Sequence, residues 1–138
     1  MKELKLIPYL SFNGNCEEAL NTYRKYLGGE IDIQTRYDNP VMKAPEEHKN
    51  KILHAHFHFD GQSIYASDAY PGSSVNTKNN NAAMSLDVPD LEKAKKIFTG
   101  LSQDGKINVH FEKQFWGDWH GNFTDRFGIS WMINYAEK

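Results

Sequence analysis

Three histidines alternate along residues 52–59, which read ILHAHFHF. Alternate residues of a β-strand share one face, and each such step advances about 6.6 Å. His54 and His56, or His56 and His58, are therefore spaced to bind one zinc ion together. All three cannot reach the same ion, because the outer two lie roughly 13 Å apart. The alternative interpretation is a polar strand face that meets a ligand or solvent.

Any further metal ligand must come from another element. His110, Asp68 and His120 are the candidates. Asp68 beside His54 would also make an acid–base pair. The single cysteine, Cys16, stands near the start of a predicted helix, where a thiol pKa can be lowered; a buried structural thiol is the alternative. No nucleophile, base and orienting residue form a recognisable triad in the sequence.

The elements that would position these side chains occur twice. Residues 15–31 (NCEEALNTYRKYLGGEI) align with residues 90–107 (DLEKAKKIFTGLSQDGKI), with Asn15 matched to Asp90. Each copy has a capping residue, an acidic first turn, an apolar stripe at helical spacing and a glycine after the stripe. A repeat at about half the chain length indicates duplication.

Strands are predicted around each of the two helices. They cover 4–12, 30–37, 52–59 and 63–68 in the first half, and 83–88, 106–112, 119–124 and 129–135 in the second. The predicted class is α+β: two tandem βαβββ modules that form a curved, partly closed mixed sheet around a cleft, with the helices on the outer face. Residues 1–138 would be a single domain, with module one at 1–69, a linker at 70–81 and module two at 82–138.

Composition excludes several classes of protein. The chain has 138 residues, a formal charge of −2 and no clear basic patch, so we expect no nucleic-acid partner. No apolar run approaches the ~20 residues of a membrane span, and the N-terminus does not resemble a signal peptide. One cysteine allows no internal disulfide. These features favour a cytoplasmic protein.

Five segments together are distinctive: PYLSFNGNCEEALNTYRKYLGGEI (8–31), LHA (53–55), YASD (65–68), SLDVPDLEKAKKIF (85–98) and FWGDWHGNFTDRFGISWMIN (115–134). Their order resembles the vicinal oxygen chelate superfamily of glyoxalases, bleomycin-resistance proteins and extradiol dioxygenases, and within it the PhnB-like branch. The resemblance implies a homodimer. Some PhnB-like proteins carry a 3-demethylubiquinone methyltransferase label. The chain has no G-x-G-x-x-G turn, and we expect neither a bound nucleotide nor methyltransferase activity.

The resemblance also implies where a superfamily metal would bind. Metal-dependent members carry ligands on the first and last strands of each module, and the matching positions here are Pro8, Tyr65, Ala83 and Met132. Proline and alanine side chains cannot ligate, and a thioether suits only soft metals. We therefore expect no superfamily metal and no other cofactor.

Strand alternation from these positions predicts which side chains line the cleft. The predicted ligand-binding residues are Phe12, His54, His56, His58, Tyr65, Ser67, Ser85, Met132 and Trp116. Apolar walls with a few polar groups are typical of small-molecule pockets. Trp116 would stack on a flat ligand or, alternatively, fill a core or dimer interface.

The sequence therefore predicts a PhnB-like protein that binds a small, partly apolar organic molecule in the cleft between the modules, without the superfamily metal. The alternative is a metal-dependent or metal-free lyase, isomerase or dioxygenase-type enzyme that uses the histidines of residues 52–59. The sequence identifies no catalytic residue for such a reaction.

Overall fold

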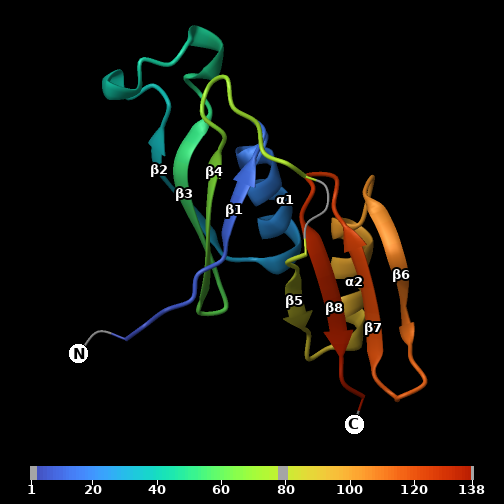
Figure 1. Ribbon diagram of the computed structural model, residues 1–138. Coiled ribbons are helices and arrows are strands. Elements are labelled where there is room, and N and C mark those ends of the chain that lie inside the picture. The colour runs from blue at the N-terminus through green and yellow to red at the C-terminus, as the bar shows by residue number, and fades with distance from the viewer. Residues whose placement is uncertain (1–2, 78–80, 138) are drawn as a thin grey trace. The chain divides into compact units, whose positions relative to one another are not determined.

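A computed structural model describes residues 3–77 and 81–137. The chain divides into two units, Met1–Val75 and Asn76–Lys138 (Figure 1). In the described residues each unit carries one α-helix and a four-stranded mixed sheet in the order βαβββ, and the first unit adds two short 3₁₀ helices, η1 (Pro40–Met42) and η2 (Glu46–His48). The predicted α+β class with two tandem modules is confirmed. Residues 78–80 of the predicted linker lie outside the described residues.

The first module contains β1 (Tyr9–Phe12), α1 (Cys16–Leu27), β2 (Glu30–Arg36), β3 (Ile52–Phe59) and β4 (Gln62–Asp68). Its strand order is β1-β4-β3-β2, with β1 parallel to β4 and the other pairs antiparallel. Helix α1 covers one face of the sheet and lies behind it in Figure 1. The stripe predicted for this helix is its buried side: Ala19, Leu20, Tyr23 and Leu27.

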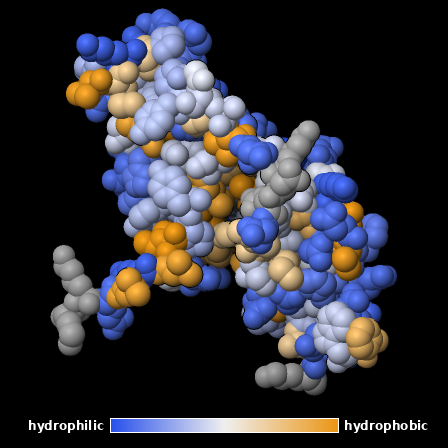
Figure 2. Space-filling view, viewed as in Figure 1, coloured by the Kyte–Doolittle hydropathy of each residue, from blue (hydrophilic) through white to orange (hydrophobic). Residues whose placement is uncertain are grey.

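The opening strand is shorter than predicted. Residues 4–12 were expected to form it, but only Tyr9–Phe12 pair with β4. The segment before β1 has no partner strand among the described residues, and Leu4 and Leu6 are almost fully exposed. Figure 2 shows apolar atoms along this N-terminal segment. The alternation of apolar and charged residues was strand-like, but a strand also needs a neighbour to pair with.

The two helices begin differently, although their sequences match. Asp90 caps the second helix as predicted, because its Oδ2 accepts a hydrogen bond from Lys93 N at 2.8 Å. Asn15 makes no such bond. Asp68, at the end of β4, accepts one from Cys16 N at 2.9 Å instead. The side-chain cap predicted at Asn15 is therefore wrong. The buried carboxylate of Asp68 accepts the hydrogen bond of the first helical N–H group instead.

The second module contains β5 (Met84–Asp87), α2 (Leu91–Leu101), β6 (Lys106–Lys113), β7 (Trp119–Thr124) and β8 (Ser130–Tyr135). Its strand order, β5-β8-β7-β6, repeats that of the first module. The buried residues on α2 follow its predicted apolar stripe, with Ala94, Ile97, Phe98 and Leu101 packed inward. No helix in the described ranges is both long and apolar enough to cross a membrane.

Candidate functional site

The three histidines of β3 lie on the face of the first sheet that α1 leaves uncovered. Ala55, Phe57 and Phe59 alternate with them and are buried. His56 is the cross-strand partner of Tyr65 on β4, and the two rings stack with centroids 3.8 Å apart and planes 12° apart. The predicted strand and its polar face are therefore present.

A hydrogen-bonded chain runs across this face. The hydroxyl of Tyr9 lies 3.1 Å from Nδ1 of His54, and Nε2 of His54 lies 2.9 Å from Nε2 of His56. The third histidine, His58, pairs instead with the Ser63 hydroxyl at 2.8 Å. The hydrogen bond between the two imidazoles needs one donor and one acceptor nitrogen, so a single proton lies between them.

The surroundings of His56 disfavour its charged form. Desolvation lowers its pKa most, and the neighbouring His54 and His58 lower it further; Asp32, its partner on β2, acts in the opposite direction. A neutral imidazole can accept a proton or bind a metal. This arrangement can therefore support acid–base chemistry or two-point metal ligation.

The prediction of which β1 side chains face the ligand side of the sheet is wrong by one residue. Phe12 was placed on the ligand-facing side with Pro8, but it is fully buried and pairs in register with Asp68. Tyr9 pairs with Tyr65, and Ser11 pairs with Ser67. Because paired residues share a sheet face, Tyr9 and Ser11 join the histidines and Ser67 there.

Asp68 does not pair with His54 as the sequence suggested. It is 2% exposed, and its second oxygen accepts a hydrogen bond from Ile52 N at 2.8 Å. Cys16 is fully buried beside it. Desolvation raises the pKa of the Cys16 thiol, and the negative charges of Asp68 and Glu17 raise it further. Both groups are structural, as the alternative interpretation of Cys16 predicted.

A second polar network lies on the matching face of the second sheet. Asn134 Nδ2 donates to Leu86 O at 3.3 Å and to Ser85 Oγ at 3.0 Å. A backbone carbonyl only accepts, so this contact fixes the orientation of the Asn134 amide. Its Oδ1 then faces His120 Nδ1 at 2.7 Å, and that nitrogen must carry the proton.

The other nitrogen of His120 is occupied too. Nε2 accepts a hydrogen bond from Asn122 Nδ2 at 3.0 Å. In the neutral ring, this network selects the tautomer that carries its proton on Nδ1. Met132, the cross-strand partner of both Ser85 and Asn122, adds an apolar surface to the same face.

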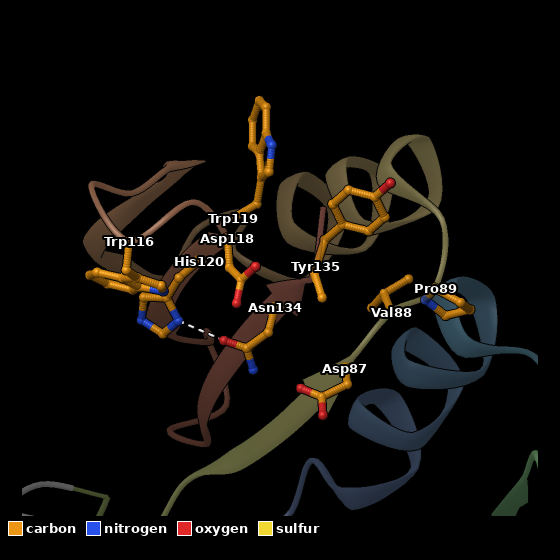
Figure 3. A pocket seen from close by; sticks show the side chains of 10 residues that line it. Asp87, Val88, Pro89, Trp116, Asp118, Trp119, His120, Asn134 and Tyr135 are labelled. Carbon is orange, nitrogen blue, oxygen red and sulfur yellow. Dashed lines mark hydrogen bonds between the residues drawn. The ribbon is translucent and has the colours of Figure 1, made fainter. Parts of the chain in front are cut away.

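A pocket of approximately 690 Å³ opens beside this network (Figure 3). All its lining residues belong to the second module. Its aromatic side chains are Trp116, Trp119 and Tyr135, and its polar ones are Asp87, Asp118, His120 and Asn134. Trp116 comes from the tight turn between β6 and β7, where Gln114 N donates to Asp118 O at 2.8 Å. Trp116 is 56% exposed.

Comparison with known proteins establishes the family to which the chain belongs. The model of the family described as 3-demethylubiquinone-9 3-methyltransferase matches residues 4–134. The chain belongs to this family. It is 31% identical to protein YjdN of Escherichia coli (strain K12), over 98% of this chain and 97% of that protein.

Solved structures agree with this membership. The crystal structure of protein PA1353 from Pseudomonas aeruginosa is 32% identical with a TM-score of 0.86, and the match covers 99% of this chain and 100% of that one. A PhnB protein from Bacillus cereus has a TM-score of 0.78 at 24% identity, covering 96% and 100%. A glyoxylase/bleomycin resistance protein/dioxygenase domain from Frankia sp. EAN1pec reaches 0.67 at 13% identity, covering 100% and 95%. The predicted PhnB-like assignment and glyoxalase-like fold are confirmed.

The donor set of this PhnB-like chain does not fit a superfamily metal centre. Of the four expected positions, Tyr65 is stacked on His56, and Pro8 offers only its backbone oxygen, which accepts a hydrogen bond from Tyr65 N at 3.0 Å. The side chain of Ala83 has no ligating atom, and that of Met132 has only a thioether. In the described part of the chain, no three His, Cys, Asp or Glu side chains cluster closely enough to hold a metal ion.

The predicted site residues fall into two groups. His54, His56, His58, Tyr65 and Ser67 share one face of the first sheet, and Ser85 and Met132 share one face of the second. Trp116 lines the pocket of the second module, as do Asp87 and Tyr135, which sequence reasoning missed. Alternation from Ser85 would have found Asp87, because the two residues are two apart on one strand.

Proposed function

We propose that this PhnB-like protein binds a small, partly apolar organic molecule in the pocket of its second module. The observation that carries the proposal is the pocket itself: approximately 690 Å³, with aromatic walls and a fixed polar group, His120, at one side. Pockets for small molecules combine apolar walls with a few positioned polar groups. A ligand site between the modules, which the sequence suggested, stays a prediction.

A fragment screen followed by amide chemical shifts would test this proposal. We expect bound fragments to shift resonances of the residues that line the pocket. Trp116→Ala should weaken such binding roughly five- to thirtyfold, because the indole supplies most of the accessible aromatic surface.

Phe115→Ala is the matched control. Phe115 is the neighbouring residue and is 97% exposed, but it does not line the pocket. Fragments that bind elsewhere, or equal losses in the two variants, would reject the proposed site. Since Phe115 contacts Trp116 edge-on at 4.9 Å, a small effect of the control is expected.

A second candidate function is an enzyme that uses the histidines of β3. The chain from Tyr9 through His54 to His56 favours it, because paired imidazoles can pass a proton or hold two positions of a metal. A lyase or isomerase would use the proton, and a metal-dependent form would need further ligands.

Metal titration and metal analysis of purified protein would test the metal-dependent form, using zinc, iron, manganese and nickel. We expect His54→Ala to abolish any stoichiometric binding, because it removes one of the two paired imidazoles. Unchanged metal content and unchanged ligand binding in His54→Ala would count against an enzyme at this strand.

The homodimer implied by the family resemblance also stays a proposal. Exposed Leu4 and Leu6 on the segment before β1 are consistent with it, because large apolar side chains usually find a covering surface. Sedimentation at micromolar concentration should show a dimer; a monomer would reject it.

A further inference from the structure

We propose that the pocket of the second module selects an organic cation, namely an amine or quaternary ammonium group attached to an apolar body. This inference rests on the proposed binding function and adds the charge of the ligand. It is drawn from two features of the pocket: two carboxylates outside the described ion pairs, and an accessible indole.

The charge of the lining is negative. Asp87 and Asp118 both line the pocket, whereas no lysine or arginine does so in the described part of the chain. Neither carboxylate belongs to any of the ion pairs formed among the described residues. Figure 3 shows the Asp118 side chain beside Asn134 and the Asp87 side chain on β5. Like charges in a lining favour a ligand of opposite sign.

The histidine of the lining is held by two hydrogen bonds. His120 donates through Nδ1 to Asn134 and accepts through Nε2 from Asn122. Both ring nitrogens therefore have partners within the second module. Among the described residues of the lining, no lysine or arginine competes with a bound cation for the two carboxylates.

The aromatic rings suit the same ligand. A cation within about 6 Å of an indole face is attracted by the ring quadrupole. Trp119 already makes such a contact, because Lys95 Nζ lies 5.3 Å from its ring centroid. Its Nε1 also donates to Glu137 at 3.2 Å, so this ring is fixed. The half-exposed Trp116 remains accessible for a ligand.

Three probes with one phenethyl body would test the charge preference: 2-phenylethylamine as its cation, neutral 2-phenylethanol and anionic 3-phenylpropanoate. Each is titrated into the full chain at low salt, and affinity is read from shifts of the pocket resonances. We expect the cation to bind about tenfold more tightly than the alcohol, and the anion to bind most weakly. Added salt should weaken only the cation's advantage.

Two variants locate the effect. Asp87→Asn and Asp118→Asn should each weaken binding of the cation roughly three- to tenfold and leave 2-phenylethanol within about twofold. Asp104→Asn is the matched control, because it removes an equal charge from an exposed turn of the same module. Asp104 has φ of +61°, a conformation that asparagine tolerates.

The outcomes separate the two proposals. If the alcohol or the carboxylate binds the pocket as tightly as the amine, the cation preference is wrong and the pocket remains a ligand site. If none of the three probes shifts pocket resonances at millimolar concentration, the cation inference is rejected. The proposed function is rejected as well only if the fragment screen also leaves the pocket unshifted.

Discussion

His54 and His56 share a proton between Nε2 atoms that lie 2.9 Å apart on the uncovered face of the first sheet. Two imidazoles in this geometry are stable with one hydrogen between them. A proton on each facing nitrogen would oppose two N–H groups. One facing nitrogen must therefore donate while the other accepts.

The first prediction concerns the pH dependence of stability. The pKa of His56 is lowered in the folded protein, mainly by desolvation. As pH falls below about 6.5, the unfolded chain binds a proton that the folded one still resists. The stabilisation that His56 contributes is therefore complete above that pH. It is lost as the pH falls through the lower pKa that His56 has in the folded protein. Urea unfolding from pH 7.5 to 5 should show this decline.

His56→Gln should flatten that decline, because it removes the titrating group. His110→Gln is the control, since His110 is exposed on an edge strand. Carbon-detected titration of the His56 ring gives a direct check. A His56 that titrates at or above an ordinary histidine pKa would contradict the prediction.

The second prediction concerns Tyr9. Tyr9→Phe removes the hydroxyl 3.1 Å from His54 Nδ1 but keeps a ring at the stacking position. Because Tyr9 is half exposed, we expect the free energy of unfolding to fall by no more than about 1 kcal/mol. Nitrogen shifts of His54 should nevertheless move, since its Nδ1 loses a partner. Tyr70→Phe, at another exposed ring, should leave them unchanged.

Much of the fold was predictable because two periodicities occur twice in the chain. Helical stripes and alternating strands led to both modules and placed seven of the eight described strands within one residue at each end. The predictions that failed concern features that depend on residues distant in sequence. Residues 4–8 have strand-like alternation but join no ladder in the described part of the chain, and the cap of α1 comes from Asp68 rather than from the adjacent Asn15.

The candidate site was less predictable than the fold. The sequence prediction took Pro8 to face the ligand. Because a shift of one residue reverses every side chain of a strand, it placed Phe12 on the ligand side and missed Tyr9. The pocket joins the end of β5 to the turn before β7. Only the folded sheet brings Asp87 and Asp118 into one lining, so spacing along the chain could not indicate a shared charge.

The third prediction concerns Asp125, within the family-like segment TDRFGISW. Its carboxylate is 4% exposed and accepts hydrogen bonds from Phe127 N, Ile129 N and Trp131 Nε1, each at 2.9 Å. Asp125→Asn would set an amide N–H against the indole N–H. We expect the free energy of unfolding to fall by about 3 kcal/mol, measured by urea unfolding.

A double-mutant cycle sharpens this test. In a Trp131→Phe background the opposing indole donor is gone, so Asp125→Asn should cost less there. Asp104→Asn, which alters an exposed turn, should change stability by under about 0.5 kcal/mol. A loss at Asp125 no larger than at Asp104 would show that the buried carboxylate does not hold this turn.

The fourth prediction compares two adjacent glycines at the end of α1. Gly28 and Gly29 have φ of +76° and +90°, where an L side chain is strained. A Cβ on Gly28 would meet nothing within 4 Å, so Gly28→Ala should cost only the backbone strain, about 2 kcal/mol at φ of +76° and ψ of −164°.

A Cβ on Gly29 would overlap the His58 carbonyl oxygen and approach Phe59 Cβ to 2.8 Å. Gly29→Ala must therefore push the helix end away from β3, and we expect a loss of at least about 3 kcal/mol in urea unfolding. The shift should also appear at the resonances of His58. Equal losses for the two variants would mean that strain alone, and not the close approach to β3, requires glycine at this position.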